Sequence, residues 1–357
     1  MTKSRKTASS ATGASLPWRY RLVACLLRTA YFGRIGVRGT PPPAKGARLV
    51  VSSHRNGAID GYTVLKAFPR AQFLVSIQLL RSRMLRWMFT GIAVVREKDR
   101  KRYGIQRAAF ADPVDAGCAH LRAGGDLVVF PEGSSEWGCR PLPYQRGAAR
   151  MARRLLEEGV PVSVLPVGLH YARPDGFRSH VEIMLGSTIT LPAREAEEPT
   201  RQWEKRVHEA IGKALDAVSV HCRDETHFNA VQARARHALA AGDSYAEALL
   251  AAQGQPELAP PPTQPHRSGL HWIWDGPLLA CLTLACLPIA LAGWYAGSKA
   301  DGRNTVTFLR MAGGFFASFV WLPIAVALAV WQPWIALLLG VLAAMGWWRY
   351  PRMCPQE

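Results

Sequence analysis

The carboxyl-terminal quarter of the chain restricts its fold most, because it contains two long stretches without a charged residue. The stretch 277–297 has no charge over 21 positions, and the stretch 311–348 has none over 38. A core helix of a soluble domain rarely continues so far without a charge, whereas about twenty apolar residues are what a helix needs to cross a bilayer. The sequence therefore predicts a membrane region over 271–357.

The second stretch is divided by Gln332 and Pro333, which predicts two helices of just under twenty residues each. Basic residues follow the first stretch and the last one, and basic segments tend to remain cytoplasmic. We expect the first stretch, with Pro288 at its middle, to enter the membrane and return, and the second to form a hairpin with two spans. Three spanning segments are the alternative.

The positive charge of the chain is concentrated in its first third. Residues 1–110 contain 22 lysines and arginines and 3 acidic residues, whereas the remaining residues contain 22 and 23. Such a surface faces an anionic partner, so nucleic acid, an anionic lipid surface and a phosphorylated substrate are the candidates. The seven cysteines are scattered without a Cys-x-x-Cys pair. This argues against a disulfide framework and a structural metal site, and favours a reducing compartment.

Three segments lie outside both the membrane region and the central part of the chain. Residues 1–15 lack the apolar core of a secretory signal, and we expect a disordered tail. Residues 16–39 predict a basic amphipathic helix that lies in the membrane interface, although packing on its own domain would suit the pattern equally well. Residues 220–270 predict a polar helical stretch and then a stiff linker with five prolines between Gln255 and Pro265.

Residues 40–219 alternate short β-rich runs with helical stretches, which predicts an α/β domain with a mixed or largely parallel sheet flanked by helices. Active sites in such sheets form in loops at the carboxyl ends of the strands. We expect strands at 48–52, 73–76, 92–95, 126–130, 160–167 and 180–185, and helices at 61–68, 82–89, 104–123 and 147–158.

A histidine and an aspartate follow the first of these strands. His54 lies in the loop after an apolar run, and Asp60 comes six positions later at the start of a helix. A histidine can take a proton from a hydroxyl, and a carboxylate can fix its tautomer and stabilise the imidazolium. On this spacing alone, a turn histidine and a helix-capping aspartate are the simpler explanation.

Two further loops follow predicted strands. Glu132, Gly133, Ser134 and Ser135 come after the strand at 126–130, where Pro131 and Gly133 predict a tight loop with N–H groups suited to an oxyanion or a phosphate. Arg96 stands at the end of the strand at 92–95, where its guanidinium could bind a phosphate with two hydrogen bonds. A simple β-turn and a solvated strand end are the structural alternatives.

Together these segments resemble the glycerolipid acyltransferase family, the glycerol-3-phosphate and 1-acylglycerol-3-phosphate acyltransferases. Four blocks carry the resemblance, in the family's order, within roughly residues 45–190. They are SSHRNGAIDGY at 52–62, GIAVVREKDR at 91–100, VVFPEGSS at 128–135 and GVPVSVLPVGLHY at 159–171, of which the last is expected to be structural.

The spacing of the first block resembles one branch of that family. The usual first block is His-x4-Asp, whereas His54 and Asp60 are spaced His-x5-Asp, as in the fungal type of glycerol-3-phosphate and dihydroxyacetone-phosphate acyltransferases and their bacterial relatives. Further similarities to that branch are RGAAR at 146–150, GFRSHVEIMLG at 176–186 and ADGRNTVTFLR at 300–310.

The resemblance implies a role for each of these polar residues. His54 would be the general base on the acceptor hydroxyl and Asp60 its orienting partner, without a covalent acyl-enzyme. Many relatives have Thr and Arg after the glycine where this chain has Ser134 and Ser135, so phosphate recognition would depend more on Arg96. Glu132 would organise the basic residues through hydrogen bonds. The implied acceptor-binding residues are Arg96, Glu132, Gly133, Ser134, Ser135 and Arg146.

The resemblance therefore implies a membrane-bound O-acyltransferase of phospholipid biosynthesis, with its catalytic domain on the cytoplasmic side of the cell membrane. It would move a fatty acyl group from acyl-CoA or acyl-carrier protein to glycerol-3-phosphate or 1-acylglycerol-3-phosphate. It implies no metal or other cofactor, and the membrane, the acyl donor and the acceptor as partners.

Two other classes of function remain open. One is an acyltransferase, transacylase or hydrolase that acts on another lysolipid or an intact phospholipid with the same pair of residues. The other is a basic protein that binds membrane surfaces or nucleic acid. The basic third lacks zinc-finger spacing, RNA-binding aromatic motifs and a helix-turn-helix pattern, so we expect no nucleic-acid partner.

Overall fold

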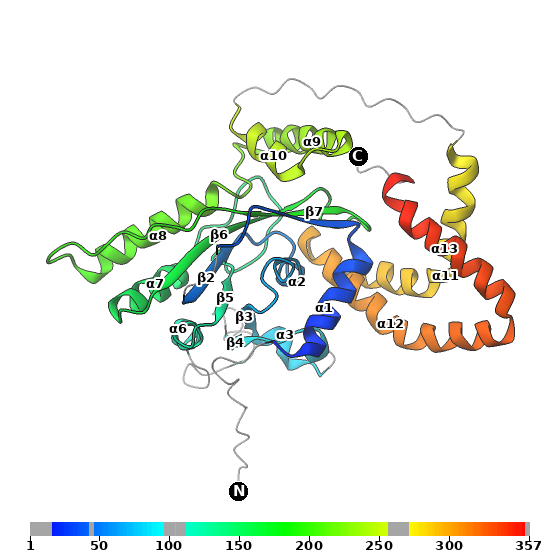
Figure 1. Cartoon of the computed structure of the whole chain (residues 1–357), viewed down its shortest axis with the longest axis horizontal. Helices are drawn as coiled ribbons and strands as arrows, with labels where there is room; N and C mark the ends of the chain where they lie inside the picture. Colours follow the sequence, from blue (N-terminus) through cyan, green and yellow to red (C-terminus); the bar gives the residue numbers. More distant parts are fainter. Residues whose placement is uncertain are drawn as a thin grey trace, which may run out of the picture.

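The structure is a computed structural model that describes residues 16–42, 46–83, 85–95, 104, 112–255 and 271–353. Its centre is a seven-stranded sheet in the order β1-β7-β6-β2-β5-β3-β4, where only β6 and β7 pair antiparallel (Figure 1). The prediction of a mixed sheet is therefore confirmed. The strands are β1 (Arg34–Arg38), β2 (Ala47–Ser52), β3 (Gln72–Ser76), β4 (Ile92–Val94), β5 (Asp126–Val129), β6 (Val162–Tyr171) and β7 (His180–Leu185).

Helices cover both faces of the sheet because its central strands are apolar on both sides. Val50 of β2 packs into one core cluster, and its neighbours Leu49 and Val51 pack into the other, as alternation along a strand requires. The first cluster includes α1 (Trp18–Tyr31), α2 (Ile59–Val64), α3 (Ile77–Arg81) and α4 (Leu85–Met88), and the second includes α6 (Pro113–Arg122), α7 (Gly147–Glu157) and α8 (Thr200–Asp216).

The parallel pairing of β2 and β5 decides where the predicted site forms. Their register runs from Arg48 opposite Asp126 to Val51 opposite Val129. Both strands therefore end at the same edge of the sheet. The loop that carries His54 and the loop that carries Glu132 start there side by side, at the strand ends where such sheets bind their ligands.

The helix predicted over 16–39 ends at Tyr31, and Arg34–Arg38 forms the edge strand β1 beside β7. Gly33 and Gly36 interrupt a helix, and the β-branched Ile35 and Val37 favour an extended chain. Within α1, the side chains of Tyr20, Ala24, Leu27 and Tyr31 are buried in the core of the sheet domain, whereas Trp18, Leu22 and Leu26 are exposed. The helix thus packs on its own domain and also presents an apolar edge.

The segment after α8 contains two packed helices, α9 (Glu225–Ala241) and α10 (Tyr245–Gln253). Their buried residues form a third apolar cluster, which includes Phe228 and Tyr245 and reaches Ala172 at the end of β6. These helices therefore belong structurally to the sheet domain, although the sequence had grouped them with the linker. The proline-rich residues 256–270 and the tail 1–15 lie outside the described part of the chain.

Glu182 joins these helices to the sheet. Its buried carboxylate accepts hydrogen bonds from the Ser244 hydroxyl (2.6 Å), the Ala246 N–H (2.9 Å) and Arg38 Nη2 (3.2 Å), and lies 3.0 Å from His180 Nε2. Burial alone would raise the pKa of Glu182, but these four partners outweigh it and hold the pKa well below the ordinary 4.5. The carboxylate thus fastens α10 and β1 to β7.

Replacement of Glu182 tests this junction. A group with a depressed folded-state pKa stabilises the fold above its unfolded pKa, and that stabilisation is lost as the pH falls. Glu182→Gln should therefore lower the free energy of unfolding by about 2 kcal/mol at pH 7, with a smaller difference from wild type below the ordinary pKa of 4.5. Thermal melting of the full chain in detergent, at pH 7 and at a pH below 4.5, measures this difference in stability. Glu209→Gln, in an exposed pair with Lys205, is the control, and an equal effect of the two substitutions would contradict the role of Glu182.

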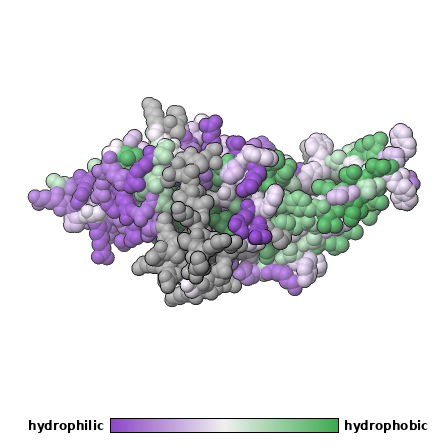
Figure 2. Space-filling model, turned by 90° about the horizontal axis from the view of Figure 1, so that it is seen from below, coloured by the Kyte–Doolittle hydropathy of each residue, from purple (hydrophilic) through white to green (hydrophobic). Residues whose placement is uncertain are grey.

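Three long helices lie together on one side of the sheet domain: α11 (His271–Gly297), α12 (Arg303–Trp331) and α13 (Pro333–Met353) (Figure 1). The segments Asp275–Gly297 and Arg303–Trp331 are long and apolar enough to cross a membrane, by length and composition. Most of the exposed large apolar side chains belong to these three helices, and Figure 2 shows an apolar surface over this end of the molecule. This surface supports the predicted membrane region.

Contacts place both ends of α11 at the same end of the hairpin that α12 and α13 form. Asp275 near the start of α11 pairs with Arg349 near the end of α13 (3.0 Å). Gly297 at the end of α11 packs against Arg310 near the start of α12. The helix is continuous through Pro288 but changes direction along its length (Figure 1). The expectation that this segment enters and returns remains a prediction, and the pairing of its ends supports it.

Labelling of single cysteines in a cysteine-free background would test this topology. Ser298→Cys lies in the loop before α12 and Glu209→Cys lies on α8, and we expect both to react from the same side of the membrane. Gln332→Cys lies in the turn between α12 and α13, and should react from the other side. Reaction of the first two positions from opposite sides would contradict the arrangement.

Candidate active site

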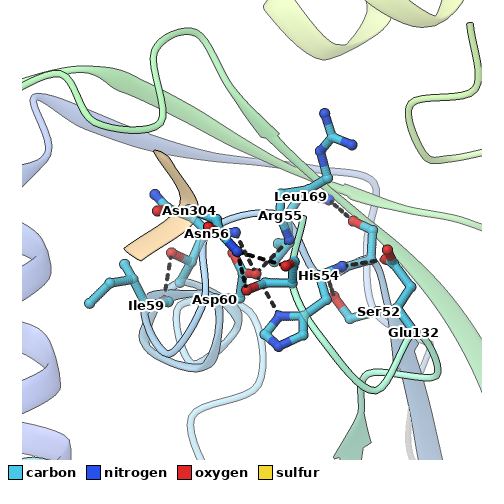
Figure 3. A network of polar contacts seen from close by, with 12 residues as sticks. Ser52, His54, Arg55, Asn56, Ile59, Asp60, Glu132, Leu169 and Asn304 are labelled. Atoms are coloured by element: carbon cyan, nitrogen blue, oxygen red, sulfur yellow. Dashed lines mark hydrogen bonds and ion pairs between the residues drawn. The ribbon is translucent and has the colours of Figure 1, made fainter. Parts of the chain in front are cut away.

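Strand β2 delivers His54 to the carboxyl edge of the sheet. The residue before it, Ser53, is held by the neighbouring β6, because its N–H donates to the Val167 carbonyl (3.0 Å) and its Oγ accepts from the Leu169 N–H (2.9 Å). His54 Nδ1 then lies 2.8 Å from Asp60 Oδ2 (Figure 3). The His-x5-Asp spacing therefore brings the two side chains into hydrogen-bond contact.

The carboxylate of Asp60 is completely buried and contacts four donors. Oδ2 accepts from the N–H groups of Arg55 (2.7 Å) and Asn56 (2.8 Å) and faces His54, and Oδ1 accepts from the hydroxyl of Tyr171 (2.6 Å). Burial and the Asp60 carboxylate raise the pKa of Tyr171 well above 10.0, so this hydroxyl remains a donor. The acceptor-only carboxylate places the imidazole proton on Nδ1, and the other three bonds prevent Asp60 from turning away.

The free nitrogen of His54 is Nε2. The imidazole stacks on Phe130 with ring centroids 4.4 Å apart and planes at 21°, and its side chain is 17% exposed. None of the described residues hydrogen-bonds Nε2, so its lone pair is available to a substrate. An imidazole that has an accessible nitrogen and a buried carboxylate behind it can remove a proton from a hydroxyl.

Glu132 connects the two loops of the site. Its Oε1 accepts from the His54 N–H (2.7 Å) and its Oε2 from the Leu142 N–H (3.0 Å). Burial raises the pKa of Glu132 above 4.5, and these two donors oppose that rise. The sequence had assigned Glu132 to organise basic residues, but its carboxylate oxygens hold main-chain N–H groups instead. Glu132 thus holds its own loop and the histidine loop together, and it fixes the backbone of His54 directly.

Gly133, Ser134 and Ser135 are brought to the same place as His54. Gly133 has a φ of 69°, which glycine adopts without strain, and its N–H donates to the Phe130 carbonyl (3.0 Å). The following Glu136 N–H donates to the His54 carbonyl (3.2 Å). Both serines are partly exposed, so this loop offers hydroxyls and backbone N–H groups beside the histidine.

One of the two predicted arginines, Arg146, is described, and it is not joined to the pair. Arg146 is exposed just before α7, and the pKa of His208 on α8 is lowered by burial and then by the charge of Arg146. Among the described residues, no hydrogen bond or ion pair links Arg146 to His54, Asp60 or the serines. Arg96 lies outside the described residues, so its role remains a prediction.

Sequence reasoning missed three residues at the site. Tyr171 ends a block that was read as structural, yet its hydroxyl holds Asp60. Asn304 lies in the segment before the last spans, and its amide contacts Ser135. Arg55 follows His54 directly. The family-like segments contained all three residues, but only their spatial neighbours reveal what the side chains do.

Arg55 is a buried cation under the site. Its guanidinium lies 4.6 Å from the Trp137 ring and 5.5 Å from the Phe228 ring, and only 2% of the residue is exposed. Its three guanidinium nitrogens have no hydrogen-bond partner among the described residues. Burial lowers the pKa of Arg55, whereas the carboxylates of Glu132 and Asp60 raise it. The cation thus lies between the loop of the site and α9 and balances the two buried carboxylates.

The comparison with protein families matches this part of the chain. Residues 34–170 match the family model described as Acyltransferase. Residues 34–170 are an acyltransferase domain. The resemblance inferred from the four sequence blocks is confirmed at this level. In the described part of this chain, no three His, Cys, Asp or Glu side chains are grouped to hold a metal ion.

Curated relatives of the acyltransferase domain include two kinds of enzyme. Glycerol-3-phosphate O-acyltransferase 1 of Saccharomyces cerevisiae is 30% identical over 136 residues, which are 34% of this chain and 18% of the relative. Lyso-ornithine lipid O-acyltransferase of Rhodobacter capsulatus is 29% identical over 171 residues, 46% of this chain and 56% of the relative. The chain therefore matches less than a fifth of the first relative and just over half of the second.

Among solved structures, the 1-acyl-sn-glycerophosphate acyltransferase of Thermotoga maritima has a TM-score of 0.37 and 18% identity. The match covers 54% of this chain and 77% of that one.

The hydrogen bond from Tyr171 to Asp60 can be tested by a single substitution. Tyr171→Phe removes one of the donors that hold the carboxylate, and we expect kcat to fall about tenfold with little change in KM, because a bond to a charged group is worth about 1.5–3 kcal/mol. Tyr245→Phe is the matched control, since that hydroxyl is also buried but has no partner among the described residues. Equal activity of Tyr171→Phe and wild type would show that the bond does not support His54.

Proposed function

We propose that the protein transfers a fatty acyl group from an acyl thioester to a hydroxyl of glycerol-3-phosphate or 1-acylglycerol-3-phosphate. The observation that carries this proposal is the imidazole of His54, with Nδ1 held by the buried Asp60 and Nε2 free. The acyltransferase domain and the relatives that acylate glycerol-3-phosphate or a lysolipid support the same class of reaction.

Two proton transfers through His54 complete the proposed reaction. Nε2 accepts the proton of the acceptor hydroxyl as its oxygen attacks the thioester carbonyl carbon. The tetrahedral intermediate then collapses, the carbon–sulfur bond breaks, and the imidazolium returns its proton to the leaving thiolate. The products are an oxygen ester and a free thiol, so no covalent acyl-enzyme and no other cofactor is required.

The role of Asp60 in this reaction is electrostatic and geometric. Its fully buried carboxylate stabilises the imidazolium that forms when His54 takes the proton, at a distance of 2.8 Å. Its three other hydrogen bonds keep this position without help from the substrate. The geometry is therefore ready before the acceptor binds, which reduces the reorganisation that the transition state requires.

The position of the site supports an acceptor at the membrane surface. Asn304, which contacts the serine loop, lies seven residues before Met311, where the charge-free stretch of α12 begins. Seven helical residues span about 10 Å. A lipid substrate could therefore keep its chain in the bilayer while its headgroup reaches His54. The R. capsulatus relative favours a second candidate acceptor, a lysolipid without a glycerol-phosphate headgroup.

Acyl transfer by the purified full chain tests the function. Acyl-CoA and acyl-carrier protein are each offered with glycerol-3-phosphate, 1-acylglycerol-3-phosphate and lyso-ornithine lipid, and the products are identified by mass spectrometry. We expect His54→Ala to abolish transfer, and Asp60→Asn to lower kcat by about 10³–10⁴-fold because an amide no longer fixes the imidazole tautomer.

The control for these variants is His221→Ala, which removes a half-exposed histidine of the same domain and should leave the rate unchanged. A His54→Ala protein with wild-type activity would refute the mechanism. Acyl exchange between intact phospholipids without a thioester would instead identify a transacylase.

A further inference from the structure

The start of α12 lies directly on the loop that carries the serines of the site. Asn304 Nδ2 donates to the Ser135 carbonyl (2.6 Å) and to Ser135 Oγ (2.8 Å). Figure 3 shows Asn304 on its helix beside Asn56, next to the His54–Asp60 pair. A side chain from the membrane region, 169 residues away in sequence, therefore positions a residue of the acyltransferase domain.

The backbone of α12 also approaches the histidine loop closely. Gly57 has a φ of 57°, and a Cβ at this position would lie 2.8 Å from the carbonyl oxygen of Asn304. Thr307, one turn further along α12, donates to the Pro174 carbonyl, which also accepts from Asn56 of the histidine loop (2.8 Å). The first turns of α12 thus have a defined position against both loops of the site.

The first turn of α12 brings a cation, Arg303, to the loop that carries the serines, which has no cation of its own. The loop from Pro131 to Trp137 contains two glutamates and no lysine or arginine. Arg303, at the start of α12, lies with its guanidinium 5.6 Å from the Trp137 ring, and its Nε donates to Asp175 Oδ1 (3.1 Å). Its side chain is 51% exposed, and its Nη1 and Nη2 form no hydrogen bond with the described residues. Two N–H-bearing nitrogens in one plane suit a phosphate, which an arginine can bind with two parallel hydrogen bonds.

The buried Arg55 does not compete for this task. It contacts Trp137 as well, but its guanidinium is enclosed between that indole and Phe228. A ligand phosphate could not reach it without displacement of these rings. Arg303 reaches solvent beside the same indole, so a phosphate can approach it directly.

We infer that Arg303 binds the phosphate of the acceptor and that Asn304 is a positioning residue that holds Ser135 for the acceptor. This inference rests on the proposed function and extends it, because it assigns acceptor recognition to the first turn of a membrane helix. Asp175 directs the guanidinium through Nε and leaves its outer nitrogens to the ligand.

Arg303→Gln and Lys299→Gln form a matched pair of substitutions for this assignment. Each removes one positive charge from the same segment, but the Lys299 ammonium lies over the Tyr295 ring, and no hydrogen bond or ion pair links it to the described residues of the site. For Arg303→Gln we expect a KM for glycerol-3-phosphate or 1-acylglycerol-3-phosphate at least tenfold higher, with kcat and the KM of the acyl donor within about threefold of wild type, because a charged bidentate contact is lost. Lys299→Gln should match wild type, and Arg303→Lys should restore part of the affinity.

Asn304→Asp tests the positioning role, because it keeps the size of the side chain and removes its two N–H donors. We expect a loss of kcat together with a higher acceptor KM, and an unchanged melting temperature in detergent. A lower melting temperature with proportionate loss of all kinetic parameters would reveal a merely structural contact and overturn the positioning role.

Lyso-ornithine lipid carries no phosphate, so it distinguishes a loss of phosphate recognition from a general loss of acceptor binding. An equal rise in KM for this acceptor and for the phosphorylated one in Arg303→Gln would overturn the inference, as would a wild-type enzyme that uses only the phosphate-free acceptor.

Equilibrium binding of labelled 1-acylglycerol-3-phosphate to wild type, Arg303→Gln and Lys299→Gln tests the inference without turnover. Weaker binding to Arg303→Gln alone would support the inference even if the proposed transfer were refuted, and equal binding to all three proteins would refute it.

Discussion

The buried carboxylate of Asp60 is the interaction on which the rest of the site depends. It lies at 0% exposure and meets donors from the histidine loop, from the imidazole and from the end of β6. A buried charge is tolerated only when it is fully hydrogen-bonded, so these segments must keep their relative positions for the domain to fold. The same requirement orients the imidazole. Stability of the fold and readiness for proton transfer therefore have one physical cause.

The turn between β6 and β7 extends this network into the membrane region. The carbonyl of Pro174 accepts hydrogen bonds from the side chains of Asn56 and Thr307. The neighbouring Asp175 accepts one from Arg303 at its carboxylate and one from Arg310 at its main-chain carbonyl. A few main-chain and side-chain oxygens thus join the histidine loop to the first two turns of α12. The acyltransferase domain and the membrane helices share a polar interface, and the site lies at it, where a headgroup and an acyl chain can be held in different environments.

Much of the domain could be predicted from short-range patterns. The apolar runs within β2 and β5 were recognised because central strands buried on both faces are largely apolar, and the bounds of β7 agree with the prediction. Strand β1 was missed entirely because Ile35 and Val37 follow a long helical pattern and this strand pairs only with the distant β7. Helices α9 and α10 looked like part of a linker because their polar surfaces hid a small apolar cluster that packs on the end of β6.

For the site, His54, Asp60 and the Gly133–Ser135 loop were assigned through the resemblance of their motifs to an acyltransferase family, because their local spacing alone was also compatible with a turn histidine, a capping aspartate and a simple β-turn. Local sequence was sufficient to predict the membrane region, since charge-free length is a local property. The partners Tyr171, Arg55 and Asn304 could not be assigned in this way, because their roles arise from contacts across 111, 82 and 169 positions of sequence. Hydrogen bonds and ring contacts act over a few ångströms of space, so the path of the chain, rather than its order, decides which residues they join.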